Sequence, residues 1–521
     1  MNHTVRILLL LTGSTLLLGW VIKHSEPTSN VGLRYIEQAR QIESDGWRDV
    51  VYQGIDHPLH PLGIAAAHHL FDGDSPGSWQ RAALLFSFAS AVFLVIPIYL
   101  LGRELFGNEA ALPGVVLVMA NALVGSSVVN VLSETSFLLS WSFGLWAAVR
   151  FLRDGRFVWL PVAIGFGALA YTTRPEGILL PMALACTILI LPLQRATRIN
   201  WPRWGGAIVL VAGGALLLSG PFVAIKGGLG TKPGIARVLG LAPHSAPQAL
   251  EREEPLSEDQ TTSETYRLAG AHAMEAIVSA VTLPLLPLAL VGMFVGASRT
   301  QRMRETLLIA IIIGSSVLGL VRLHATGGYV TARHALIPGV IMTLAAGAGL
   351  CWLTSKVAIP GRLVGLAHER FRLGPAVWVV LIAPLVIVPY VRSLGPAHPG
   401  PFAVYYSAGD WLVENTRPEE KVLDLTDWSL FFSGRDGYQF ADVYRAPADS
   451  QTRWIVVRKP AVPGYWHYSK TIRELLDGRA AVAQFPAQVA PGELQISIYD
   501  RKGGVPLAAD VNRPEQTRAQ R

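Results

Sequence analysis

Apolar residues fall into long uninterrupted runs along most of the chain. About eleven runs approach the ~20 residues that an α-helix needs to cross a bilayer core of roughly 30 Å. In chain order they cover residues 5–22, 82–101, 110–129, 134–152, 157–173, 177–193, 205–225, 276–297, 306–321, 335–354 and 374–392. The pattern predicts an all-α polytopic membrane protein. Because no A-x-A-type cleavage site follows Ile22, the first run is expected to be a retained signal anchor rather than a cleaved signal peptide.

From about residue 403 the pattern changes, because apolar runs shorten and charged residues alternate with aromatic ones. Four segments carry short periodic patterns. Residues 411–425 predict a helix, a turn and a strand, and residues 453–459 predict a strand. Residues 469–478 predict a helix ended by glycine, and residues 493–501 predict a last strand. The chain is therefore expected to consist of a membrane domain over 1–402, a small α/β domain over 403–502 and a disordered tail over 503–521.

The stretch 23–81, between the first two spans, is long and polar. Its first part has apolar residues at helical spacing (Val31, Tyr35, Ala39 and Ile42) with Glu37, Arg40 and Glu43 between them. This pattern predicts an amphipathic helix on the membrane surface, and residues 64–71, IAAAHHLF, predict a second one. Residues 53–63, QGIDHPLHPLG, lie between the two helices. We expect the prolines of this segment to fix a non-helical turn.

Composition and charge distribution give the orientation. The chain is 51% hydrophobic and only 16% charged, and its net charge is +7. Basic residues concentrate at the N-terminus and in alternate short loops: Arg6; Arg150, Arg153 and Arg156; Arg195, Arg198 and Arg203; Arg299, Arg302 and Arg304; Lys356, Arg362, Arg370 and Arg372. By the positive-inside rule this predicts a cytoplasmic N-terminus and an extracytoplasmic C-terminal domain. The rule also explains the basic balance without a nucleic-acid partner.

Charged residues recur in the predicted outer turns. They are Asp56, Glu134, Arg174, Glu176, Arg322, Arg333 and His334. Snorkelling or a structural ion pair explains any one of them equally well. Their recurrence in almost every outer turn indicates a common polar cavity. In such a cavity a carboxylate can take a proton from an acceptor hydroxyl, and arginines can hold a phosphate and stabilise it as it leaves.

Metal and cofactor motifs are weak or missing. The sequence has no GxxxxGK[ST] or HExxH motif and no convincing GxSxG context. The spacing His57-x-x-His60 could suggest zinc, but the prolines around it and the lack of a third ligand argue against a metal there. Cys186 and Cys351 lie inside apolar runs and read as small core residues. No cofactor is required, and a divalent cation held by outer carboxylates stays open.

In their order along the chain, the motifs resemble those of the membrane glycosyltransferases of the GT-C fold. The resemblance is to the family 39-like branch, which contains the protein O-mannosyltransferases and the lipid A aminoarabinose transferase. The resemblance covers nearly the whole chain and rests on short motifs with consistent sidedness. They are Asp56-His57-Pro58 with His60-Pro61, Ser133-Glu134-Thr135, Thr173-Arg174-Pro175-Glu176-Gly177, and Tyr329-Val330-Thr331-Ala332-Arg333-His334.

The resemblance implies an inverting transferase of the cell (inner) membrane. It would move a sugar from a polyprenyl-phosphate donor to a lipid, glycan or protein acceptor on the outer face. Asp56 would be the base, and Glu134 would orient the acceptor or a neighbouring arginine. The other expected site residues are Arg174, Arg333 and Tyr329 at the donor phosphate, and His57, His60, Glu176, Arg322 and His334 along the cavity.

One departure from the family pattern leaves alternatives open. Family members usually carry an aspartate at the start of the first surface helix, where this chain has Val31. Either Asp56 has taken over the role of base, or the alignment shifts, or transferase activity is lost. A transporter or flippase of a lipid-linked sugar and a non-catalytic membrane scaffold therefore remain as competing hypotheses. Against a transporter, the charges gather at one face and no internal repeat is clear.

Overall fold

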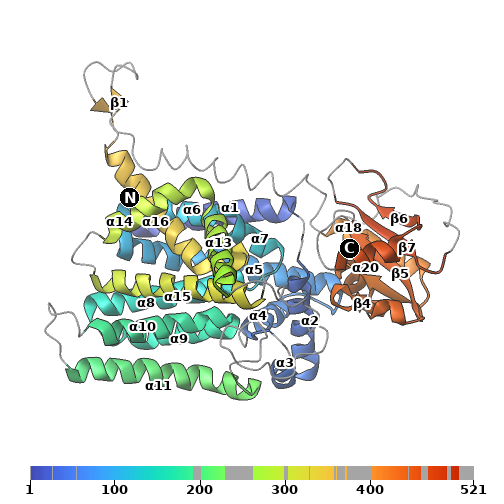
Figure 1. Cartoon of the computed structure of the whole chain (residues 1–521), viewed down its shortest axis with the longest axis horizontal. Helices are drawn as coiled ribbons and strands as arrows, with labels where there is room; N and C mark the ends of the chain where they lie inside the picture. The colour runs from blue at the N-terminus through green and yellow to red at the C-terminus, as the bar shows by residue number, and fades with distance from the viewer. Residues whose placement is uncertain are drawn as a thin grey trace. The chain divides into compact units, whose positions relative to one another are not determined.

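The computed structural model describes residues 2–25, 27, 29–53, 56–191, 201–228, 262–297, 303–327, 329–356, 359–360, 370–371, 402–443, 445–458, 468–489 and 494–503. The chain divides into two compact units (Figure 1). The first, here called the helical unit, contains Met1–Lys23, Arg34–Asp74 and Ser78–Leu394. The second, the sheet unit, contains His24–Leu33, Ser75–Gly77 and Gly395–Arg521.

Up to residue 356, all regular secondary structure among the described residues is helical. Its elements are α1 (His3–His24), α2 (Asn30–Asp45), α3 (Trp47–Gln53), α4 (Leu59–His68), α5 (Pro76–Phe106), α6 (Asn108–Met119), α7 (Ala122–Val129), α8 (Glu134–Asp154), α9 (Trp159–Thr173), η1 (Pro175–Ile178), α10 (Leu179–Ile190), α11 (Trp201–Lys226), α13 (Thr262–Val281), η4 (Leu283–Leu285), α14 (Leu286–Ala297), α15 (Met303–Gly327), η6 (Ala332–Ala335) and α16 (Leu336–Lys356). A short antiparallel pair follows, β1 (Ile359–Pro360) with β2 (Arg370–Phe371).

The lengths and composition of these helices are those of an integral membrane protein. Among the described residues, 6 helices are long and apolar enough to cross a membrane. The number rises to 8 if α6 with α7, bent by 46°, and α13 with α14, bent by 85°, each form one span. The helices α9 and η1–α10 are apolar but shorter. The expected count of eleven is therefore not confirmed, and the expected span 374–392 lies outside the described residues.

The loop between α1 and α5 contains three helices where two were expected. The first expected helix corresponds to α2, and α3 follows it. The second, α4, begins at Leu59, earlier than expected, so His60 and Pro61 lie in its first turn. A proline is tolerated there because the first helical N–H groups have no partner within the helix. The expectation of a non-helical turn throughout QGIDHPLHPLG is therefore wrong beyond Pro58.

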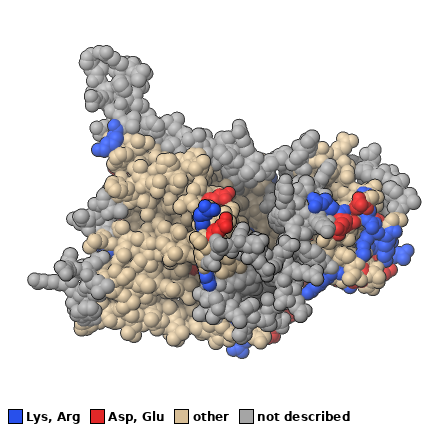
Figure 2. All heavy atoms as spheres, in the orientation of Figure 1, with Lys and Arg blue, Asp and Glu red and all other residues tan. Residues whose placement is uncertain are grey.

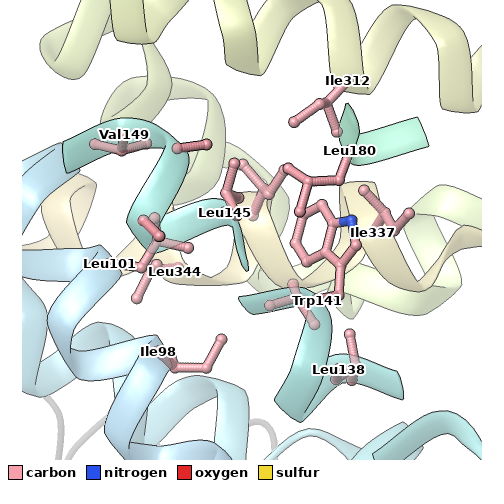
Figure 3. Packing of buried hydrophobic residues seen from close by; sticks show 14 of the residues in the cluster. Ile98, Leu101, Leu138, Trp141, Leu145, Val149, Leu180, Ile312, Ile337 and Leu344 are labelled. Atoms are coloured by element: carbon pink, nitrogen blue, oxygen red, sulfur yellow. The ribbon is translucent and has the colours of Figure 1, made fainter. Parts of the chain in front are cut away.

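Helix α8 lies inside the helical unit, and most of its residues are buried. In Figure 1, α8, α9, α10, α11 and α15 run nearly parallel. Figure 3 shows Trp141 of α8, which is completely buried, surrounded by side chains from several other helices, among them Leu180, Ile312 and Ile337. In a bilayer such contacts act mainly through van der Waals packing, since lipid tails are as apolar as leucine. This packing fixes the position of α8, whose first residue is Glu134.

Small residues let α16 approach its neighbours closely. A Cβ atom at Gly292 of α14 would lie 1.8 Å from the carbonyl oxygen of Ala345 in α16. Only a residue without a side chain allows the two backbones to come this near. The close contact fixes α16, and with it the η6 turn at its start, which carries Arg333.

The sheet unit is a small α/β domain. Its elements are α18 (Ala403–Asn415), β3 (Lys421–Asp424), α19 (Trp428–Ser433), β4 (Gly437–Gln439), η8 (Phe440–Asp442), η9 (Ala446–Ala448), β5 (Thr452–Arg458), α20 (Tyr468–Leu476), β6 (Ala481–Phe485) and β7 (Ile496–Asp500). The strand order is β4-β3-β5-β7-β6, and β4, β3 and β5 run parallel while β7 runs antiparallel to β5 and β6. The expected strands and helices are confirmed. The sequence reading missed α19, β4 and β6, and most of the expected tail lies outside the described residues.

The two units differ in surface chemistry. Figure 2 shows that the visible described surface of the helical unit is largely uncharged, whereas the sheet unit carries many lysine, arginine, aspartate and glutamate side chains. An uncharged exterior suits helices that face lipid, and a charged exterior suits a domain in water.

Candidate functional site

Glu134 joins two arginines that are far away in the sequence. Its side chain is only 1% exposed. The Oε1 atom lies 2.6 Å from Arg333 Nε and 2.9 Å from Arg174 Nη1. Arg174 precedes η1 and Arg333 lies in η6, so three separate turns meet at one carboxylate. Three of the residues expected to share a cavity are thus in direct contact.

The Arg174 turn is shaped by its neighbours in the sequence. Arg174 has φ −150° and ψ 145°, the extended conformation that a following proline favours, and α9 therefore ends before it. Gly177 packs against α9 so tightly that a Cβ atom would lie 2.2 Å from Tyr171 N. The turn brings Glu176 back to Arg174, with Oε1 3.0 Å from Nη2 and Oε2 3.3 Å from Nε. Two carboxylates therefore occupy the Arg174 guanidinium.

The Arg333 turn is held by a capping box. Thr331 N–H donates to His334 Nδ1 at 3.2 Å, and the Thr331 side chain accepts from the backbone N–H of His334. His334 Nδ1 is therefore an acceptor, so the structure gives His334 a capping role. The Arg333 side chain is 34% exposed, and the exposed Tyr329 ring lies 5.8 Å from the His334 ring. Of the two arginines at Glu134, Arg333 is the more accessible to a ligand.

A second buried carboxylate, that of Asp56, lies in the loop between α1 and α5. The Asp56 side chain is 1% exposed, and its Oδ2 atom lies 2.6 Å from Arg34 Nε of α2. The neighbouring residue, Tyr35, has its hydroxyl 3.0 Å from Ser133 Oγ. Burial raises the pKa of the Tyr35 hydroxyl, and the nearby charges of Asp56 and Glu134 raise it further. Tyr35 thus stays protonated near both carboxylates and can donate a hydrogen bond.

The two histidines of the DHPLHP segment have different surroundings. His60 is fully buried and contacts Ser136 Oγ at 3.0 Å and the carbonyl oxygen of Val131 at 3.2 Å. Burial lowers the pKa of His60 to about 4, so its imidazole is neutral at pH 7. The ring of His57 instead packs 5.4 Å from the ring of Tyr171 and 5.1 Å from that of Phe222.

Arg322, another expected site residue, bonds to a neighbouring helix. Arg322 of α15 donates to the Tyr266 hydroxyl of α13 at 2.7 Å. Arg34 and Tyr35 were not among the expected site residues. The signal in the sequence was an arginine next to an aromatic residue on the amphipathic helix. Such a pair is equally typical of a surface helix that has no functional site.

The buried carboxylate of Glu134 can accept a further hydrogen bond. Glu134 Oε2 is buried and has no hydrogen-bond partner among the residues that the structure describes. Leaving a buried polar atom unpaired costs roughly 1–3 kcal/mol, so a donor group of a ligand would be favoured there. Within the described part of the chain, no group of three or more His, Cys, Asp or Glu residues is placed to hold a metal ion.

Part of the sequence is similar to a known protein family. Residues 56–215, which include Asp56, Glu134 and Arg174, match the family model of dolichyl-phosphate-mannose-protein mannosyltransferase. No curated protein matches the sequence.

Solved structures extend the similarity. ArnT from Cupriavidus metallidurans, bound to undecaprenyl phosphate, has 12% identity and a TM-score of 0.53, and the alignment covers 99% of this chain and 100% of that one. The oligosaccharyltransferase AglB from Archaeoglobus fulgidus, in complex with an inhibitory peptide and a dolichol-phosphate, has 13% identity and a TM-score of 0.54 over 86% of this chain and 69% of that one. An Archaeoglobus fulgidus oligosaccharyltransferase in complex with Zn and sulfate has 11% identity and a TM-score of 0.54, and the alignment covers 86% of this chain and 67% of that one. The chain therefore has the GT-C fold that its sequence resembles.

Proposed function

We propose that this protein is an inverting glycosyltransferase that moves a sugar from a polyprenyl-phosphate donor to an acceptor on the outer face of the membrane. The observation that carries the proposal is the meeting of Arg174 and Arg333 on the buried carboxylate of Glu134. Solved structures of the same fold contain dolichol-phosphate or undecaprenyl phosphate, which supports a lipid-linked phosphate as the ligand class.

The arginines are the proposed phosphate ligands. Guanidinium groups bind phosphate oxygens through parallel charge-assisted hydrogen bonds, and they stabilise the charge that grows on a leaving phosphate. Arg333 is partly exposed, and Glu134 holds its Nε edge at 2.6 Å. These ion pairs favour a role for Glu134 in positioning the two arginines over a role in orienting the acceptor. Tyr329, beside His334, is a further proposed phosphate contact.

Asp56 is the proposed general base. The acceptor O–H proton goes to the carboxylate as the acceptor oxygen bonds to the anomeric carbon, and the bond from that carbon to the phosphate oxygen breaks. The polyprenyl phosphate leaves with the electron pair, and the configuration at the sugar carbon inverts. In the structure Arg34 occupies Asp56, but its side chain is 46% exposed, so it can move when an acceptor binds. The proximity of Asp56 to Tyr35 and Glu134 supports one common site.

A transfer assay tests the proposal. Purified protein would be incubated in detergent with a radiolabelled polyprenyl-phosphate sugar and a panel of lipid, glycan and peptide acceptors. We expect label in an acceptor, with release of polyprenyl phosphate. Movement of intact labelled lipid across a vesicle membrane without bond cleavage would instead indicate a flippase. Binding of the donor without transfer to any acceptor would favour a non-catalytic scaffold.

The proposed orientation places the N-terminus in the cytoplasm and the sheet unit outside the cell membrane. Basic residues in alternate loops support it. The test uses a chain in which Cys186 and Cys351 are replaced by serine, with single cysteines at the exposed positions Arg156 and Ser450. An impermeant thiol reagent should label the second in intact cells and the first only after lysis. Labelling of both from the same side would contradict this topology.

A further inference from the structure

The turn that carries Glu134 has a strained backbone. Val131, three residues before Glu134, has φ +52°, in the left-handed region that a β-branched residue rarely adopts. Its side chain is fully buried. The next residue, Leu132, is fixed by a hydrogen bond of 2.8 Å from its N–H to the carbonyl oxygen of Ser127. A strained conformation of this kind persists only when the surrounding structure holds it in place.

His60 contacts this turn on both sides of Glu134. Its Nε2 lies 3.2 Å from the carbonyl oxygen of Val131, and its Nδ1 lies 3.0 Å from Ser136 Oγ. A carbonyl oxygen only accepts, so Nε2 carries the proton and Nδ1 accepts from Ser136. The single hydroxyl proton of Ser136 then goes to His60 rather than to the Ser133 carbonyl oxygen 3.1 Å away. One neutral imidazole thus joins residues 131 and 136, and Glu134 lies between them.

Tyr35 holds the same turn from α2. Its hydroxyl bonds to Ser133 Oγ at 3.0 Å, and the edge of its ring meets the His60 ring, with centroids 4.9 Å apart. Both α2 and α4 therefore contact the few residues that precede and begin α8.

We infer that His60 is a positioning residue, which holds the strained turn from Val131 to Ser136 so that the Glu134 carboxylate meets Arg174 and Arg333. The consequence for ligand binding rests on the proposed function, since it assumes that these arginines bind the donor phosphate. The link between His60 and the turn does not depend on any ligand. The low pKa of His60 agrees with a ring that is neutral at pH 7.

The first measurement needs no ligand. Hydrogen–deuterium exchange would be followed at the Leu132 amide in the full-length protein in detergent. His60→Phe keeps a ring but loses both hydrogen bonds, and we expect exchange about tenfold faster, since each bond contributes roughly one factor of ten at most. His60→Gln can still donate to the Val131 carbonyl oxygen and should keep most of the protection. Unchanged exchange in His60→Phe would overturn the inference.

The second measurement tests whether His60 stabilises the strained backbone conformation of Val131. Glycine adopts φ +52° without a steric penalty, so Val131→Gly should return the exchange of His60→Phe close to the wild-type value. Val131→Ala also shortens the side chain but leaves the strain, and it should not rescue. If Gly and Ala behave alike in the His60→Phe background, the inference is wrong.

The third measurement connects the turn to the site. Undecaprenyl phosphate binding would be titrated by the shift in melting temperature. We expect about tenfold weaker binding for His60→Phe and recovery in His60→Phe/Val131→Gly. Equal affinity of wild type and His60→Phe would overturn the positioning role. If the wild type itself does not bind this lipid, the proposed function fails, and the exchange experiments still decide the role of His60.

Discussion

Helix α8 has a cluster of carboxylates and arginines at each of its ends. At its first residue, Glu134 contacts Arg174 and Arg333. Near its last turn, Arg150 and Arg153 both pair with Glu104 of α5. At 1.5 Å per residue the two clusters lie roughly 25 Å apart. The same side chains therefore occur at the two ends of one helix.

The two clusters differ in how completely the buried carboxylate is bonded. Both carboxylate oxygens of Glu104 have an arginine partner, Arg150 also pairs with Asp154 at 2.7 Å, and Arg153 lies 3.5 Å from Glu305. Glu134 Oε2 has no hydrogen-bond partner in the described part of the chain. A buried carboxylate with both oxygens bonded to arginines is typical of a structural link. A buried carboxylate with one unpaired oxygen has capacity for a donor group of a ligand.

The largest expected effect is that of Asp56→Asn, in the cluster that contains Glu134. The amide keeps the shape of the side chain but cannot take up the acceptor proton, so turnover should fall by about 10²–10⁴-fold with folding preserved. The matched control is Asp154→Asn, at the opposite end of α8, which should leave turnover unchanged. Both are measured in the transfer assay. Full activity in Asp56→Asn would make Glu134 the leading candidate for the base.

Arg333→Ala should have the next largest effect. Removing the guanidinium weakens donor binding and the stabilisation of the leaving phosphate, and turnover should fall by about 10²–10³-fold. Arg322→Ala is the control, since Arg322 bonds to Tyr266 and its loss should change kcat and the donor KM little. Steady-state kinetics over a range of donor concentrations separates the two constants. Equal losses in both variants would show that the site extends to α15.

Glu104→Gln should affect stability rather than chemistry. It removes the acidic partner of two arginines at a buried position, and such a change typically costs about 3–5 kcal/mol. We expect a lower melting temperature in detergent and unchanged turnover per folded molecule at low temperature. A loss of turnover without a loss of stability would remove the distinction between the two ends of α8.

The smallest expected effect is a pH dependence of the melting temperature that comes from His60, near the Glu134 end of α8. Burial lowers the pKa of His60 to about 4 from an ordinary value of 6.5, although the charges of Glu134 and Asp56 oppose the shift. The neutral ring therefore contributes stability that is complete above pH 6.5 and is lost as the pH falls toward 4. The melting temperature of the wild type should drop over this range more than that of His60→Gln. Parallel curves for the two proteins would contradict the assignment.

Much of the fold followed from periodicity. Long apolar runs predicted the membrane helices, and short alternating runs predicted β3, β5 and β7. The reading failed where an element is short or broken, as in β4, β6 and the 85° bend between α13 and α14. An apolar run alone does not indicate a change of direction. The signal at this bend is Pro284 of η4, which lies between the two helices.

The site was predictable only in part. The acids and arginines of the outer turns were visible because a charge beside an apolar run is costly and needs a reason. The pairing of Glu134 with Arg333, across 199 residues, depends on tertiary packing and leaves no local pattern. The strain at Val131 could not be predicted either, since valine is an unlikely residue for a left-handed turn.

The division of the chain has a consequence for the segment between α1 and α5. Residues His24–Leu33 and Ser75–Gly77, which flank the loop on both sides, belong to the sheet unit, and there the Tyr405 hydroxyl donates to the Pro27 carbonyl oxygen at 3.1 Å. Residues Arg34–Asp74, which carry Asp56 and His60, are thus joined at both ends to segments of the sheet unit, so both chain connections of this segment run through that unit.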